Sequence, residues 1–196
     1  MKIIKNKDLN QLVELLKKDQ VVAVPTDTVF GVCARYDHEV AQENLRDLKK
    51  RPVTKAFPLM CSDLEQVKGI CEISQEEERI IQKFMPGPLT VILKKKSCVP
   101  DFVNGGQENL AIRLATSPEL KEIIQGVGVP VYMTSANLSG EPAALTVEDV
   151  LNSIPKVEAI LEGKVEYSVA SSIIQWEQGE WKVLRQGPIQ KEDLVK

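Results

Sequence analysis

The sequence contains little histidine and no long hydrophobic run. His38 is the single histidine among 196 residues, which argues against Ser–His–Asp or Cys–His catalytic sites and against multi-histidine metal centres. The longest apolar stretches, such as residues 21–24, fall far short of the roughly 18 residues that a transmembrane helix needs. The amino terminus lacks a long apolar segment and a small-residue cleavage site, so we expect no signal peptide and a cytoplasmic location.

Cysteine spacing and charge exclude further classes of protein. Cys33, Cys61, Cys71 and Cys98 form no Cys-x-x-Cys pair, so reduced thiols are expected rather than a zinc or thioredoxin-like site. The net charge of −3 gives no global basic field of the kind that nucleic-acid binders use, although it leaves room for a local patch. Composition is that of an ordinary globular protein, and the length favours a single domain over residues 1–196.

Helix and strand signals alternate along the whole chain. Apolar residues at helical spacing predict helices over residues 9–16, 41–49, 75–84 and 118–124, and a short helix after Thr146. Apolar and β-branched runs predict strands over residues 20–24, 57–61, 89–93, 110–114, 129–133, 157–161, 172–176 and 181–184, the last two joined by a turn at Gln178-Gly179. This alternation favours a layered α+β or α/β domain over an all-β barrel or a helix bundle.

The segment Pro25-Thr26-Asp27-Thr28-Val29-Phe30-Gly31 is the first candidate for a site. It places two hydroxyls and a carboxylate directly after an apolar strand, at the end where α/β sheets usually bind ligands. A proline-led turn whose side chains bond their own backbone explains the same residues equally well. Both interpretations stay open from the sequence.

The second candidate is the segment 49–55, which holds the densest positive charge in the chain. Lys49, Lys50, Arg51 and Lys55 provide four cations within seven residues. Lysine point charges and a bidentate arginine suit a polyphosphate ligand. A solvated cationic turn at the carboxyl end of a helix is the alternative.

The third candidate is the segment 132–140, again directly after an apolar strand. Ser135 and Asn137 offer donors to a phosphate or a base, or they form an Asx or Ser/Thr turn. Arg113 interrupts an apolar strand and needs an anion partner, either from the protein or from a ligand. Arg185 follows the last predicted strand, and the sequence has neither a Walker loop nor a Gly-x-Gly-x-x-Gly fingerprint.

Six motifs follow one another along the chain: Pro25 to Gly31, Lys49-x-Arg51-Pro52, Phe84 to Thr90, Ala111-Ile112-Arg113, Ser135 to Gly140 and Leu184-Arg185-x-Gly187. Taken together and in this order, they resemble the YrdC family over essentially the whole chain. The resemblance implies a single-domain YrdC-like α+β fold, with a twisted mixed β-sheet, helices on both sides and a basic concave cleft. The family includes threonylcarbamoyl-AMP synthases, which form threonylcarbamoyl-AMP and pyrophosphate from L-threonine, bicarbonate and ATP for tRNA modification.

The resemblance also implies roles for individual residues. Thr28, Arg113 and Ser171 match positions that bind threonine, while Lys49 and Arg51 match the basic pair at the nucleotide phosphates and are the expected catalytic residues. Mg²⁺ would enter with ATP, held mainly by phosphates, without a dedicated metal site. Expected partners include tRNA or double-stranded RNA and other tRNA threonylcarbamoylation proteins, but no membrane. Further nucleotide contacts are implied for Lys55, Ser135, Asn137 and Arg185.

Some positions depart from the family pattern and leave alternatives open. Phe30, Thr134 and Gln186 stand where the family commonly has tyrosine, proline and proline, and Met60 stands where longer members have a histidine. A YciO-like paralogue, a relative that adenylates another small amino acid, and a non-catalytic RNA-binding protein using the same cleft are the alternatives. Aromatic residues make up only 5% of the chain, and none lies in segment 49–55, so the stacking platforms of RNA binders are lacking. This favours the enzyme.

Overall fold

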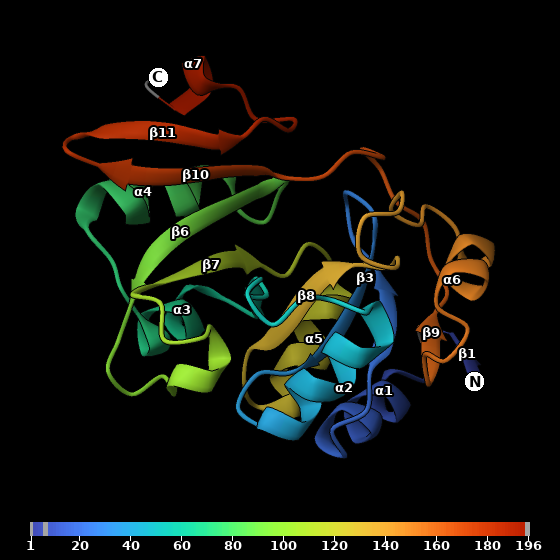
Figure 1. Cartoon of the computed structure of the whole chain (residues 1–196). Helices are drawn as coiled ribbons and strands as arrows, with labels where there is room; N and C mark the ends of the chain where they lie inside the picture. The colour runs from blue at the N-terminus through green and yellow to red at the C-terminus, as the bar shows by residue number, and fades with distance from the viewer. Residues whose placement is uncertain (1, 6–7, 195–196) are drawn as a thin grey trace.

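The computed structural model describes residues 2–5 and 8–194 of the chain (Figure 1). Its strands are β1 (Lys2–Ile4), β2 (Val22–Pro25), β3 (Phe30–Arg35), β4 (Leu59–Cys61), β5 (Cys71–Glu72), β6 (Leu89–Lys95), β7 (Asn109–Leu114), β8 (Val131–Ser135), β9 (Ala159–Leu161), β10 (Ser172–Glu177) and β11 (Glu180–Arg185). Its helices are α1 (Leu9–Lys17), α2 (Glu39–Lys49), α3 (Leu64–Ile70), α4 (Gln75–Phe84), α5 (Pro118–Val127), α6 (Val147–Ser153) and α7 (Lys191–Leu194), with a 3-10 turn at Asp101–Val103.

All described strands belong to one mixed sheet. The neighbour order is β1-β9-β2-β3-β8-β4-β7-β6-β10-β11, with β5 paired to β6 beside this path. Parallel pairs such as β4–β7 and β6–β10 occur together with antiparallel pairs such as β3–β8 and β6–β7. Strands far apart in the sequence are therefore neighbours in the centre of the sheet.

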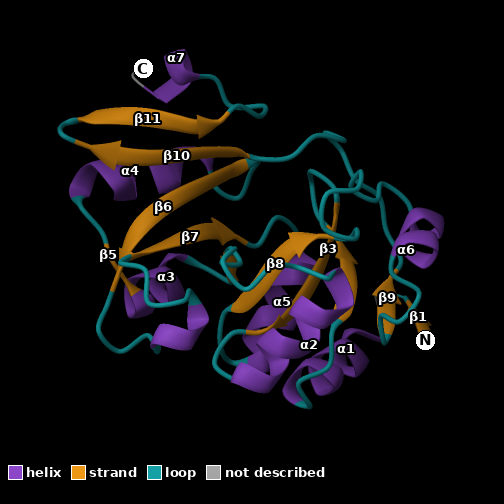
Figure 2. Cartoon of the chain, in the orientation of Figure 1, coloured by secondary structure: helices purple, strands orange, loops and turns teal. Residues whose placement is uncertain are grey.

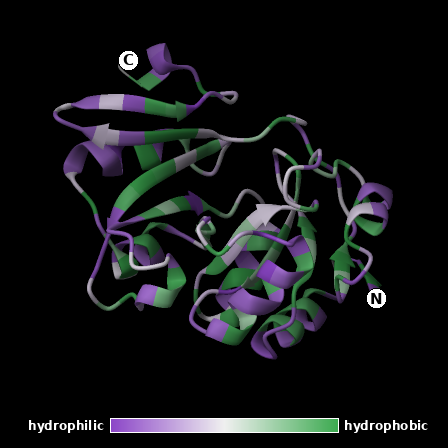
Figure 3. Ribbon diagram, viewed as in Figure 1, coloured by the Kyte–Doolittle hydropathy of each residue, from purple (hydrophilic) through white to green (hydrophobic). Residues whose placement is uncertain are grey.

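Helices lie on both faces of this sheet (Figure 2). α1 and α5 bury Leu16 and Ile124 in one apolar cluster, and α2 and α4 bury Leu45 and Ile80 in the cluster on the opposite face. The outward faces of α2 and α4 are hydrophilic (Figure 3), as expected for helices that cover a sheet. The expected mixed sheet with helices on both sides is confirmed.

Local signals located several elements correctly. Ser74 and Glu77 form the expected capping box at the start of α4, and Ser117 caps α5 by accepting from the Leu120 N–H. The expected hairpin joins β10 to β11, and both turn residues have positive φ, 53° at Gln178 and 84° at Gly179. This geometry matches the right-handed twist of paired strands.

Five short elements were not predicted: β1, β3, β5, α3 and α7. β3 begins at Phe30, inside the segment interpreted as a site loop, and helices cover Val32 and Cys33 from opposite faces. A strand that is buried on both faces lacks the alternation of apolar and polar residues that marks a half-buried strand. α3 is only seven residues long and contains Gly69, which weakens its helical signal.

Candidate active site

A cavity of about 600 Å³ lies on the sheet face that α1 and α5 cover elsewhere. Side chains alternate between the two faces of each strand. On β7, Ala111 and Arg113 line the cavity and Ile112 between them lies in the opposite core. On β6, Thr90 lines the cavity and Val91 lies in that core. The cavity floor is thus one face of the sheet, and its volume is within the usual range for small-molecule sites.

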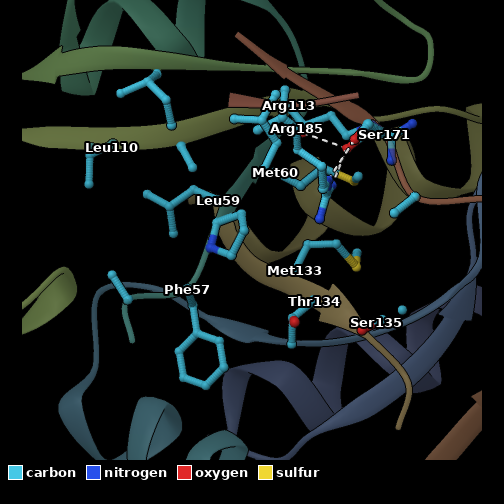
Figure 4. A pocket seen from close by; sticks show the side chains of 18 of the residues that line it. Phe57, Leu59, Met60, Leu110, Arg113, Met133, Thr134, Ser135, Ser171 and Arg185 are labelled. Carbon is cyan, nitrogen blue, oxygen red and sulfur yellow. Dashed lines mark hydrogen bonds between the residues drawn. The ribbon is translucent and has the colours of Figure 1, made fainter. Parts of the chain in front are cut away.

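Six of the nine predicted site residues line this cavity. Arg113, Arg185 and Ser171 lie next to one another (Figure 4). Met60 and Thr134, two of the departures from the family pattern, also line it. The predicted residues brought together are Thr28, Arg51, Arg113, Ser135, Ser171 and Arg185.

Sequence reasoning assigned no role to several other polar residues of the cavity. Thr90, Asn109 and Gln175 line it from β6, β7 and β10. Each occupies the cavity-facing position of a largely apolar strand. Side chains alternate between the two faces of a strand, so these residues could be identified once it was known which face lines the cavity.

Thr26 and Thr28 organise the loop between β2 and β3. The Thr26 hydroxyl donates to the Val29 carbonyl at 2.6 Å, so its hydrogen is not available to Thr28. Thr26 Oγ1 also accepts from the N–H groups of Thr28 and Val29, both at 3.2 Å, and lies 3.0 Å from Thr28 Oγ1. Thr28 Oγ1 accepts from Arg113 Nη1 at 2.9 Å, and its second lone pair can accept from a ligand N–H or O–H. The segment is both a self-bonded turn and part of the cavity wall.

The anion partner of Arg113 is a residue of the protein itself. Nη2 donates to Asp27 Oδ1 and to the Gly87 carbonyl at 2.9 Å, and Nε also reaches that carbonyl at 3.2 Å. With the bond to Thr28, four of its five N–H groups are engaged, which leaves one on Nη1. Burial lowers the pKa of the Arg113 guanidinium, and the Asp27 carboxylate acts in the opposite direction.

Arg185 is held by Ser171, the residue just before β10. Nε donates to the Ser171 carbonyl at 2.9 Å and Nη2 to Ser171 Oγ at 3.1 Å, while Ser171 Oγ and Thr90 Oγ1 share a hydrogen bond of 2.8 Å. Burial lowers the pKa of Arg185. Among the described residues nothing bonds to Nη1, so this edge of the guanidinium is open to a ligand.

Ser172 clamps the chain that follows Arg185. Its hydroxyl oxygen accepts from the N–H groups of Gly187 and Ile189, both at 3.0 Å, and its hydrogen goes to the Ile189 carbonyl at 2.8 Å. The backbone of Gly187 therefore lies directly against residues 170–172. This contact fixes the end of β11 and, with it, the position of Arg185.

Arg51 is the second guanidinium with an open edge. Nε and Nη2 donate to the carbonyls of Lys55 and Ala56 at 3.1 and 2.7 Å, and the group lies 4.9 Å from the centre of the Phe57 ring. Arg46 lies 5.0 Å from the same ring. Burial, and to a lesser extent Arg46, lowers the pKa of Arg51. Nη1 of Arg51 has no partner in the part of the chain that the structure describes.

Three predicted residues do not line the cavity. Lys49 is 1% exposed, and its ammonium donates to the carbonyls of Ser135 and Asn137, the latter at 2.7 Å. Asn137 donates to the carbonyls of Leu138 and Glu141 at 2.8 and 2.7 Å. Lys55 is exposed. The interpretation of segment 49–55 as a solvated turn is therefore wrong for Lys49, and the nucleotide roles of these three residues stay predictions.

Burial of Lys49 has a measurable effect on stability. Burial, with a smaller contribution from Arg51, lowers the pKa of Lys49 from 10.5 to about 8. Between these values the unfolded chain binds the extra proton, so this residue makes folding more favourable as pH rises. A Lys49→Met variant lacks this ionisable group. We therefore expect the free energy of unfolding of wild type, relative to that of the variant, to rise by about 3 kcal/mol between pH 7 and pH 10.5.

Urea denaturation of both proteins across this pH range measures the difference. Lys55→Met is the matched control, because it removes an exposed lysine from the same segment, and its offset from wild type should not change with pH. The carbonyls left without a donor in Lys49→Met lower its stability at every pH and do not alter the slope. Parallel pH profiles for wild type and Lys49→Met would contradict the assignment.

The described residues contain no group of three or more histidine, cysteine, aspartate or glutamate side chains placed to hold a metal ion. Nor does any helix in that part of the chain combine the length and the hydropathy of a membrane span. All four cysteines are free thiols, as expected. The polar side chains that line the cavity carry hydroxyl, amide and guanidinium groups.

Comparison with known proteins identifies the family. A family model for Sua5, YciO and YrdC proteins, described as telomere recombination, matches residues 14–187. A protein of Methanocaldococcus jannaschii, provisionally named threonylcarbamoyl-AMP synthase, is 34% identical over 203 residues, which cover 97% of this chain and 96% of that protein. The threonylcarbamoyl-AMP synthase of Aliivibrio fischeri is 38% identical over 147 residues, 74% of this chain and 80% of that protein.

A solved structure agrees with these matches. Sua5 of P. abyssi, crystallised in complex with L-threonine, superposes with a TM-score of 0.88 at 27% identity and covers 94% of this chain. The present chain spans only 57% of that Sua5 chain. Because the family model matches most of its length and both relatives exceed 30% identity, the chain belongs to the Sua5/YciO/YrdC family.

Proposed function

We propose that this protein is an L-threonylcarbamoyladenylate synthase, which forms threonylcarbamoyl-AMP and pyrophosphate from L-threonine, bicarbonate and ATP. The observation that carries the proposal is the set of side chains that line one cavity. The guanidinium groups of Arg51 and Arg185, each with an open edge, line it together with Thr28, Arg113 and Ser171. We call the part lined by the last three residues the amino-acid end. The names of the two relatives, and the threonine in the Sua5 crystal, support the same chemistry.

This reaction needs positioning and charge stabilisation rather than a protein nucleophile. The amine of threonine and bicarbonate form a carbamate with loss of water, and a carbamate oxygen then attacks the α-phosphorus of ATP and expels pyrophosphate. His38 bonds to Asp19 and is exposed, outside the cavity. Burial raises the pKa of Cys33 and Cys71 to about 12, so neither is a thiolate at neutral pH. The residues of the cavity suit the remaining tasks.

Each task can be assigned to a specific group. The free N–H groups of Arg51 and Arg185 suit phosphate oxygens, which charge-assisted bonds stabilise as pyrophosphate leaves. The remaining lone pair of Thr28 Oγ1 accepts from the substrate amine, and the one free N–H of Arg113 donates to its carboxylate. ATP enters as its magnesium complex, with the ion held by phosphates and water, since the nearby Asp27 is already paired with Arg113.

The burial of Phe57, the aromatic residue next to Arg46 and Arg51, argues against the RNA-binding alternative. Phe57 is 2% exposed and lies against both Arg46 and Arg51, so its ring is not available to stack on a base. Contact with tRNA or double-stranded RNA, association with other threonylcarbamoylation proteins and a cytoplasmic location stay predictions from the family resemblance.

Pyrophosphate release tests the proposal directly. With magnesium and ATP present, we expect release to require threonine and bicarbonate together, because neither the amine alone nor bicarbonate alone supplies the attacking carbamate oxygen. A coupled phosphate assay measures the rate, and mass spectrometry identifies the product. Serine, valine and glycine replace threonine in parallel reactions. Equal rates with these amino acids would indicate another adenylate-forming activity, and release with ATP alone would contradict the proposal.

A further inference from the structure

Two guanidinium groups meet where the amino-acid end of the cavity adjoins the part assigned to phosphates. Arg185 lies close enough to Arg113 for its charge to lower the Arg113 pKa, and both line the cavity beside Ser171. Two adjacent, partly buried guanidinium groups are the usual means of binding phosphate. On these two residues alone, the amino-acid end would therefore bind phosphate as readily as a carboxylate.

Asp27 changes that charge balance from outside the cavity. Its carboxylate pairs with Arg113 Nη2, and its side chain is only 8% exposed. Oδ2 has no hydrogen-bond partner among the described residues, so no donor other than Arg113 bonds to this carboxylate. Asp27 is absent from the lining of the cavity. It therefore does not contact a ligand in the cavity, and only the charge of its carboxylate, next to Arg113, acts on one.

The backbone holds Asp27 in this position. Its carbonyl accepts from the N–H groups of Glu166 and Tyr167, each at 2.8 Å, and its N–H points to Thr116 Oγ1 at 3.4 Å. These contacts fix the backbone of Asp27, and the ion pair with Arg113 holds its carboxylate. In a site of low dielectric, its charge offsets most of the field that Arg113 would otherwise present.

We propose that Asp27 sets the charge specificity of the amino-acid end, so that this end accepts a zwitterionic amino acid and discriminates against phosphate. A zwitterion brings a carboxylate to Arg113 and an amine to Thr28, and its net charge of zero matches the neutral Asp27–Arg113 pair. A phosphate brings only negative charge, which Asp27 repels. The proposal rests on the proposed function only in naming threonine as the occupant.

The test uses the full chain with inorganic phosphate as the probe. Threonine binding is measured by calorimetry at increasing phosphate concentration, and phosphate binding is measured without any amino acid. In wild type, we expect phosphate to compete with ATP and to have little effect on threonine. In Asp27→Asn, which keeps the size of the side chain and removes its charge, we expect phosphate to compete with threonine about tenfold more strongly or more.

Glu166→Gln is the matched control, because it removes the same charge from an exposed side chain on the loop bonded to Asp27. It should retain the wild-type pattern. Asp27→Ser, which also removes the charge and keeps a hydroxyl that can accept from Arg113, is the second variant if Asp27→Asn does not fold by thermal melting, and the same increase in competition by phosphate is expected for it. An unchanged effect of phosphate in Asp27→Asn, or weaker binding of both ligands, would overturn the proposal. If wild type binds threonine but releases no pyrophosphate, the proposed function fails and this test still applies.

Discussion

Replacing Arg113 with alanine is expected to lower the free energy of unfolding by about 3 to 5 kcal/mol and to abolish threonine binding. The substitution leaves Asp27 as a buried carboxylate without a cation and removes two donors from the Gly87 carbonyl. It also removes the donor to Thr28. Urea denaturation measures the loss of stability, and threonine titration by calorimetry measures the loss of binding.

Two further variants separate stability from binding. Arg113→Lys keeps the charge but cannot reach Gly87, Thr28 and Asp27 at once. We therefore expect a smaller loss of stability than in Arg113→Ala, together with weak threonine binding. The double variant Asp27→Asn, Arg113→Met removes both charges and should recover part of the stability lost in Arg113→Ala, because no unpaired charge remains. Wild-type stability in Arg113→Ala would show that the ion pair with Asp27 does not hold the fold.

Gly187→Ala is the second substitution with a large expected effect. A Cβ atom at Gly187 would lie 2.4 Å from the Ser172 nitrogen, 2.5 Å from the Ala170 oxygen and 2.6 Å from the Ser171 carbonyl carbon. All three are backbone atoms, so the two segments must separate. Overpacking of this kind costs about 1 to 3 kcal/mol or more. The separation also displaces Arg185 from Ser171, so we expect ATP affinity to fall about tenfold.

Thermal melting and nucleotide titration of Gly187→Ala check both effects. Gly69→Ala is the matched control, because no atom lies within 4 Å of the position that its Cβ would take. That substitution in α3 should leave ATP affinity unchanged and raise stability slightly, by up to about 1 kcal/mol. Wild-type ATP affinity in Gly187→Ala would mean that the clamp at Ser172 does not position Arg185.

The sequence located elements whose boundaries depend on local chemistry. The caps at Ser74 and Ser117, and the turn at Gln178-Gly179, involve residues a few positions apart, and all three are present. β3 escaped detection because its residues are apolar toward both faces of the sheet. What distinguishes such a strand is the cover on each side, which comes from distant helices.

The site shows the same division between local and distant information. The motifs contain five of the six predicted residues that line the cavity, the family resemblance added Ser171, and Arg113 was expected to need an anion. That the anion is Asp27, 86 residues earlier, depends on how β7 and the loop after β2 are placed in the sheet. Lys49 was expected at a nucleotide because it lies in a cationic run. Its burial depends on carbonyl groups of Ser135 and Asn137, 86 and 88 residues away, which no local pattern reveals.

The order of strands in the sheet also constrains how this protein folds. The cavity floor requires β3 beside β8 and β6 beside β10, pairings that join residues such as Gly31 with Ser135 and Thr90 with Ile173. Such non-local pairings close long loops and form slowly. During synthesis, nearly the whole chain must emerge before Ser171 and Arg185 reach the cavity. A ligand that contacts Ser171 or Arg185 therefore has its complete site only after β10 has paired with β6, and until then one edge of β6 offers unpaired backbone groups to other chains.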